Sequence, residues 1–91
     1  MVYPIAYQED AAPVSALHPE AAPVDLYQYI EHKIGASIHD IQADSPSRFK
    51  VIEEEALRDI VVMSEISGQS KIVRLGPDTL SNPECARLLG L

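Results

Sequence analysis

The side chains that most often carry out chemistry in proteins are few in this chain of 91 residues, and they stand apart from one another. The histidines His18, His32 and His39 lack the close spacing, to a cysteine or to each other, that zinc sites usually show. The single cysteine, Cys85, has no base predicted beside it, and the carboxylates at 53–55 fan around a helix too widely to act as an acid and base pair. No glycine-rich loop leads into a helix, as a phosphate site requires. The sequence therefore predicts a protein that is not an enzyme, with no metal site and no cofactor.

Charged and polar side chains give a stronger signal, although the overall charge opposes it. The chain has 14 acidic and 7 basic residues, and a formal charge of −7 disfavours attraction to the phosphates of a nucleic acid. Four of the seven basic residues nevertheless fall in two short stretches, at 48–50 and 71–74, each flanked by hydroxyl or amide side chains. The candidate contact residues of the two stretches are Ser45, Ser47, Arg48, Lys50, Val51, Gln69, Lys71 and Arg74.

The first stretch lies at the start of a predicted amphipathic helix. Ser45 is a suitable N-cap, and Pro46 suits the first helical position, where its missing N–H has no intrahelical partner. Apolar side chains then recur every three or four residues, which is the period of a buried helical face, at Phe49, Ile52, Ala56, Leu57 and Ile60. The opposite face, which could touch a partner, consists of Ser47, Lys50, Val51, Glu54 and Arg58. The pattern predicts that this helix ends between Ile60 and Met63.

Further elements are predicted on both sides of this helix. Asp25 and Ser37 are suitable N-caps for two earlier helices, of which the first ends at Gly35. After the long helix, β-rich runs at 61–66 and 71–75 flank a polar connection of four residues that contains glycine. Such an arrangement predicts a β-hairpin.

The order of these elements over residues 25–76 resembles the winged helix-turn-helix superfamily. The expected fold class is mainly α with a β-hairpin: three helices, then a two-stranded wing, then a short C-terminal helix. In winged-helix proteins that bind DNA, the second helix of the motif enters the major groove with its start and the wing follows the backbone. The resemblance therefore implies a small transcriptional regulator that binds double-stranded DNA through the eight candidate residues. It also implies a homodimer, because small winged-helix proteins often pair through elements that flank the domain.

A second interpretation stays open beside that one. Lys50 and Glu54, and Glu54 and Arg58, are spaced four residues apart, so the outward helix face could be a ladder of ion pairs worth about 0.2–0.5 kcal/mol each. Winged-helix domains also serve as protein-binding adaptors or inhibitors, and an acidic helix face or the N-terminal segment would suit that role. Fold alone does not choose between DNA and a protein partner. The placement of the basic residues favours DNA.

The chain is expected to form one small domain with two flanking segments. Residues 1–24 hold four of the seven prolines, two copies of Ala-Ala-Pro-Val and no lysine or arginine, which predicts a disordered acidic arm. Residues 25–76 form the predicted winged-helix domain, and 77–91 contain a short helix, capped by Asn82, that docks or dimerises. With one cysteine, no apolar leader and no spanning segment, a soluble cytoplasmic protein without membrane contact is expected.

Overall fold

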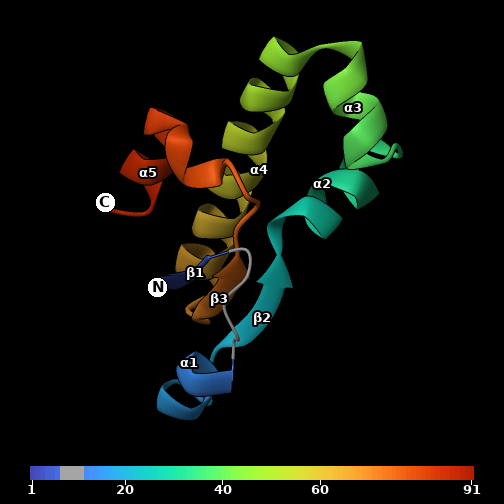
Figure 1. Cartoon of the computed structure of the whole chain (residues 1–91). Helices are drawn as coiled ribbons and strands as arrows, with labels where there is room; N and C mark the ends of the chain where they lie inside the picture. The colour runs from blue at the N-terminus through green and yellow to red at the C-terminus, as the bar shows by residue number, and fades with distance from the viewer. Residues whose placement is uncertain (7–11) are drawn as a thin grey trace.

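The computed structural model describes residues 1–6 and 12–91, and it shows a small sheet beside one end of a long helix (Figure 1). The strands, in their spatial order, are β1 (Val2–Ile5), β3 (Lys71–Arg74) and β2 (Ala22–Asp25). Both pairings are parallel, and Lys71 lies in register with Val2 on one side and with Ala22 on the other. The strand that comes last in the chain is therefore the central one.

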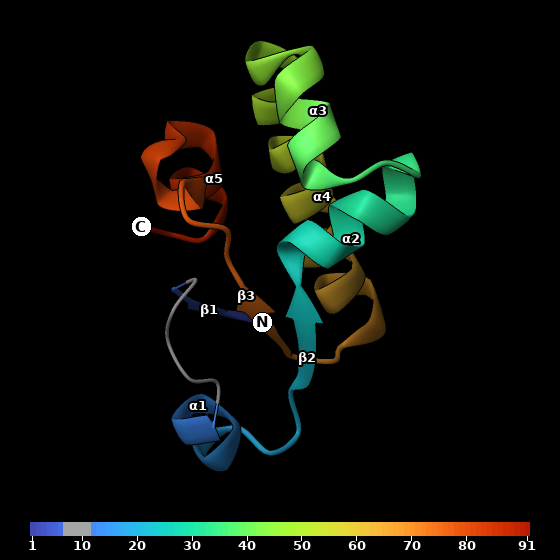
Figure 2. The same cartoon turned by 45° about the vertical axis from the view of Figure 1, so that its right-hand side comes forward.

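Helices make up most of the rest of the described chain. They are α1 (Ala12–Leu17), α2 (Leu26–Ile34), α3 (Ile38–Asp44), α4 (Pro46–Ser67), the 3-10 turn η1 (Thr79–Ser81) and α5 (Pro83–Leu88). In both views α2 and α3 lie on one side of α4 and α5 lies on the other, while α1 lies at the end of the sheet away from α3 (Figure 1, Figure 2). Among the described helices, none combines the length and the apolar character needed to cross a membrane.

The predicted helix starts are confirmed by hydrogen bonds at the caps. The side chains of Asp25, Ser37, Ser45 and Asn82 accept hydrogen bonds from backbone N–H groups in the first turns of α2, α3, α4 and α5. Each of these side chains satisfies a donor that has no partner within its helix. Helix α2 ends at Gly35, as predicted, where the backbone adopts a left-handed φ of 80° that glycine tolerates best.

The core joins α4 to α2 and to the sheet. Its completely buried apolar side chains include Leu26, Ile30, Ala56, Leu57, Ile60 and Val73. Most of the stripe predicted on α4 is buried, with Ile52 only partly so, whereas Val51 on the outward face is half exposed. The predicted register of α4 is therefore confirmed. Full burial of a side chain such as Leu57 stabilises the fold by roughly 1.5–3 kcal/mol.

The predicted β-hairpin is wrong. Residues 61–66, expected to be the first strand of the wing, continue α4. The helix ends at Ser67, and the following Gly68 has a left-handed φ of 70°. The two valines in this run favour strands, but Ile60 and Ser64 are buried at helical spacing, and packing there outweighs the local propensity. The second run does form a strand, β3, but this strand pairs with β1 and β2. The protein is mixed α+β, and the wing is replaced by a parallel sheet.

The connection between α3 and α4 also differs from the expected motif. A helix-turn-helix usually has a turn of three or four residues between its helices. Here Ser45 alone separates the two helices, as the C-cap of α3 and the N-cap of α4. The Ser-Pro step therefore makes a corner between two helices without an intervening turn.

The N-terminal segment differs from the expected disordered arm. The described parts of residues 1–24 contain β1, α1 and most of β2, and 7–11 lie outside the described residues. Ile5 is buried, and Val24 packs against the core cluster. The proline in each of the two strands lies on an edge of the sheet, which is where a strand tolerates a missing N–H.

The C-terminal helix α5 packs on its own domain. Cys85 is completely buried in the same core cluster as Leu57. At the surface, Arg58 of α4 places its Nη2 atom 3.3 Å from Oε1 of Glu84 in α5. The predicted need for this short helix to dock is thus met within the chain, and a homodimer stays a prediction.

Candidate functional site

The eight candidate contact residues lie in two groups near opposite ends of α4. One group occupies the N-cap and first two turns of α4, and the other occupies the segment from Gln69 to the end of β3. A helix of 22 residues spans about 33 Å, so the two ends of α4 are roughly that far apart. Among the described residues, no hydrogen bond or ion pair joins one group to the other.

Few of the candidate residues take part in strong ion pairs. Arg48 lies 4.0 Å from Asp44 of α3, and the ammonium of Lys71 donates a hydrogen bond to Gln69 Oε1 at 3.2 Å. The alternative ladder through Glu54 does not form in the described part of the chain, since Arg58 pairs with Glu84 of α5. The outward face of α4 is therefore largely free to contact something else.

A cluster of buried polar side chains, which was not predicted, lies beside the first half of α4. Glu53 is only 2% exposed, and Thr79 and Cys85 are completely buried. Thr79 Oγ1 donates to Glu53 Oε2 at 3.1 Å, and the Cys85 thiol, a weak donor, lies 3.9 Å from Glu53 Oε1. The Gly76 backbone N–H in turn donates to Thr79 Oγ1 at 2.8 Å. One carboxylate thus links α4, η1 and α5.

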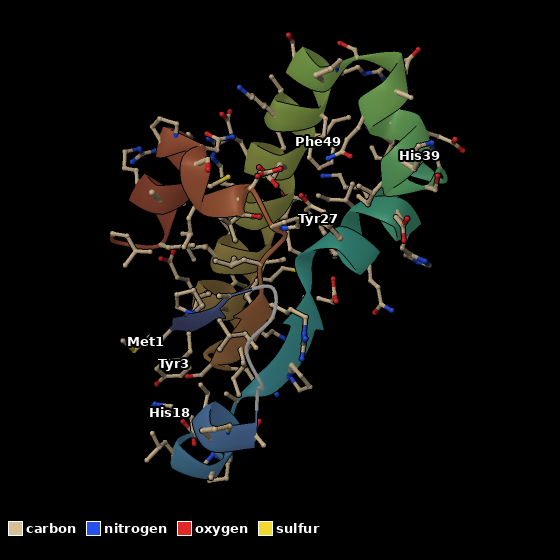
Figure 3. The ribbon with its side chains drawn as sticks, in the orientation of Figure 1. Met1, Tyr3, His18, Tyr27, His39 and Phe49 are labelled. Atoms are coloured by element: carbon tan, nitrogen blue, oxygen red, sulfur yellow. The ribbon has the colours of Figure 1, made fainter. Side chains whose placement is uncertain are left out.

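The ring of Tyr27 closes one side of this cluster. It stands edge-on to Phe49, with ring centroids 5.6 Å apart, between α2 and α4 (Figure 3). A Cβ on Gly76 would lie 2.0 Å from Tyr27 Cζ, so the ring occupies space that only a glycine leaves open. The Tyr27 hydroxyl is buried near Glu53, but it makes no hydrogen bond of good geometry with the described residues.

Burial makes the charged forms of these groups costly. Desolvation raises the pKa of Glu53 above its ordinary value, and the polar groups of Thr79, Tyr27 and Asn82 oppose that rise. Desolvation, together with the neighbouring Glu53 carboxylate, raises the pKa of Cys85 to about 12. The thiol is therefore protonated at neutral pH and a poor nucleophile. The same two causes raise the pKa of Tyr27.

A pocket of about 340 Å³ opens beside the cluster. Its walls come from α3, the first two turns of α4 and the segment around η1, and include Gln42, Phe49, Lys50, Glu53, Asp78 and Asn82. The Asn82 amide donates to the backbone oxygen of Lys50 at 3.5 Å and ties the two walls together. Among the eight candidate contact residues, Lys50 alone lines this pocket. Its volume is near the lower end of the range for small-molecule sites.

The histidines lie outside this site. His18 stacks on Tyr3 with ring centroids 3.8 Å apart, and His39 is exposed on the outer side of α3 (Figure 3). In the described ranges, no three His, Cys, Asp or Glu side chains are grouped so that they could hold a metal ion.

The burial of Glu53 agrees with its spacing from the apolar residues of α4. Position 53 falls four residues after Phe49 and three before Ala56, so the three side chains share one face of α4. Glu55 is exposed, which agrees with the prediction that the successive acids fan around the helix. Thr79 is 26 residues away from Glu53, and no local pattern links the two.

Comparisons with protein-family models, with curated proteins and with solved structures find no significant match to this chain. The winged-helix resemblance therefore stays a prediction from element order, and the parallel strand arrangement differs from that of a wing.

Proposed function

We propose that this chain is a protein-binding domain whose partner packs on the exposed side of α4. The observation that carries the proposal is the exposure of Val62, Met63 and Ile66 in the C-terminal half of α4, at 42%, 44% and 81%. These three residues are called the α4 apolar patch below. Single exposed apolar side chains are common, but three within five residues of one helix are typical of a face that a partner covers.

The three side chains of the patch share one side of the helix. At 3.6 residues per turn, Val62 and Ile66 are about 40° apart around the axis, and Met63 is about 60° from Ile66. Ile60 and Ser64, which are buried, face the domain interior. A partner helix or loop can therefore contact all three apolar side chains without displacing the core.

The rim of the patch is acidic. Glu55 and Glu65 are exposed on the same helix, and Asp59 is partly exposed. Asp59 accepts hydrogen bonds from Lys33 and Tyr29 of α2, whereas Glu55 and Glu65 form no ion pair with the residues that the structure describes. The partner surface expected from complementarity is apolar at its centre and carries lysine or arginine at its edge. The same acidic rim, with a net charge of −7, disfavours a nucleic acid on this face.

DNA binding is a second candidate because of one observation at the other end of α4. Ser47, Arg48 and Lys50 are exposed in the first two turns of a long helix, where the helix dipole favours a phosphate. We place this function second because Asp44 lies 4.0 Å from Arg48 and would face the same phosphate.

Site-specific photo-crosslinking in the cells that make the protein tests the first proposal. A photoreactive amino acid in place of Met63 should give a crosslink to one defined protein. The same amino acid in place of Leu17, which is 77% exposed on α1, should not give that crosslink. No crosslink from position 63, or equal crosslinks from both positions, would count against the proposal.

A pair of variants makes the test specific. Ile66→Asp should abolish the crosslink while the melting temperature stays within about 4 °C of the parent, because this side chain is exposed. Val51→Asp, which places the same charge at an exposed site near the other end of α4, should retain the crosslink. For the second candidate, a low-salt gel-shift titration with mixed DNA fragments should show retardation that Arg48→Ala and Lys50→Ala weaken.

A further inference from the structure

We propose that the pocket between α3, α4 and η1 is a binding site for a small organic cation with a planar amidinium or guanidinium group. The inference does not depend on the protein-binding surface. The pocket is lined by the first two turns of α4, whereas the α4 apolar patch lies in the last two.

The innermost group of the pocket is a carboxylate with too few donors. A carboxylate can accept about four hydrogen bonds. In the described chain Glu53 accepts one of good geometry from the Thr79 hydroxyl and a weak one from the Cys85 thiol, while the Tyr27 hydroxyl and the Asn82 amide lie near enough to favour its charged form. Its Oε1 atom therefore has no strong donor of good geometry among the described residues, although the residue is only 2% exposed. A buried carboxylate in this state gains most from a ligand that brings both positive charge and N–H groups.

The charges around the opening also favour a cation. Asp78 adds a second carboxylate at the exposed rim, and among the described residues Lys50 is the only basic one in the wall. Lys50 is exposed, so its ammonium can extend into solvent while its aliphatic part stays in the wall. When Glu53 is ionised, Glu53 and Asp78 against Lys50 leave one negative charge, and a bound cation would favour this ionised form over the neutral one that burial favours.

The apolar part of the wall indicates the shape of the ligand. Phe49 and Pro46 line the pocket, and a flat group can lie against such a surface. An amidinium presents two parallel N–H groups that match the two oxygens of a carboxylate, which an ammonium cannot do. A volume of about 340 Å³ limits the occupant to a small molecule or a single side chain.

Benzamidine and benzamide test this assignment on the full chain, because they share one shape and differ in charge. We expect benzamidine to bind about tenfold or more tightly than benzamide in an NMR titration. The amide resonances that shift should include those of Gln42, Phe49 and Asn82. Equal affinities, or no shift at these residues at about 10 mM benzamidine, would overturn the proposal.

Three variants separate the carboxylates from general effects. Glu53→Gln keeps the shape and removes the charge, so the preference for benzamidine should fall about tenfold. Asp78→Asn lies at the exposed rim, where it leaves the fold intact, and should weaken benzamidine by several fold. Glu20→Gln, at an exposed site outside the pocket, should leave benzamidine binding unchanged. If Glu53→Gln does not fold, the Asp78→Asn variant and the comparison of benzamidine with benzamide still test whether the pocket prefers a cation. An unchanged preference in Asp78→Asn together with equal probe affinities would refute a cation site.

An arginine side chain of a peptide and a free small molecule share the chemistry proposed here. Titration with agmatine and with an acetylated, amidated arginine peptide distinguishes the two sources. Binding of agmatine alone identifies a small-molecule site, and binding of the peptide with at least equal affinity identifies a docking site for an arginine. If neither agmatine nor the arginine peptide binds, and benzamidine has not bound either, both a small-molecule site and an arginine docking site are ruled out.

Discussion

Replacing Gly76 by alanine should destabilise the fold through a single steric contact. The new Cβ would lie 2.0 Å from Tyr27 Cζ and 2.1 Å from Cε1, far inside the contact distance of about 3.5–4.0 Å between carbon atoms. Gly76 does not have a positive φ, so an alanine suits its backbone and the effect comes from the ring alone.

The size of the effect follows from what the ring must give up. Moving Tyr27 away from Gly76 disturbs its edge contact with Phe49, a kind of pair worth about 0.5–1.5 kcal/mol. Forcing extra volume into a packed region costs about 1–3 kcal/mol. The free energy of unfolding should therefore fall by about 2–4 kcal/mol, which is a large part of the 5–15 kcal/mol typical of a domain.

Urea denaturation followed by far-UV circular dichroism measures this change. Gly90→Ala is the matched control: its φ of 76° strains an alanine, but no atom lies within 4 Å of the new Cβ, so a loss of about 1 kcal/mol is expected. In a Tyr27→Leu background the ring is gone, and Gly76→Ala should then cost less than about 1 kcal/mol. An alanine at 76 that costs nothing, or costs the same in both backgrounds, would refute the steric argument.

Two further predictions concern the N-terminal strand and the buried carboxylate. Ile5 is 3% exposed, so Ile5→Ala should cost about 2–4 kcal/mol, whereas Leu17→Ala at a site 77% exposed should cost little; equal melting temperatures would mean that β1 does not pack. Because burial raises the pKa of Glu53, the folded state binds a proton more tightly than the unfolded state. The stability of the parent should therefore fall as pH rises from the ordinary pKa of 4.5 to the folded-state pKa, by at most about 1.4 kcal/mol per pH unit. Glu53→Gln should lack this decline in denaturation midpoints measured from about pH 4 to 8, and identical pH profiles would contradict the assignment.

The helical part of the fold could be predicted because its signals are local. A cap such as Ser45 and its first turn lie within four residues, and the buried stripe of α4 repeats within two turns. The sheet could not be predicted in this way, because each strand has four residues and pairs with a segment far away in the chain. The polar cluster has the same property, since Glu53 meets Thr79 only after η1 has packed on α4.

The repeated Ala-Ala-Pro-Val shows how far context decides local structure. In the first copy, Ala12 to Val14 form the start of α1, and Ala11 lies outside the described residues. In the second copy, Ala22 to Val24 form β2. The same letters become a helix or a strand according to whether a partner such as β3 is available, so composition alone predicts neither.

The central place of β3 also sets the order in which the fold can be completed. β1 and β2 are made early, but the partner of both is β3, whose first residue is Lys71. While the chain is being synthesised, α1 to α4 can form local contacts before β3 exists. During that time β1 and β2 have no strand to pair with. Pairing over such long separations is slow, and unpaired strand edges can associate with other chains in the meantime. A chain cut short before Lys71 keeps the residues of its main helices but exposes two strands that nothing in the remaining molecule can cover.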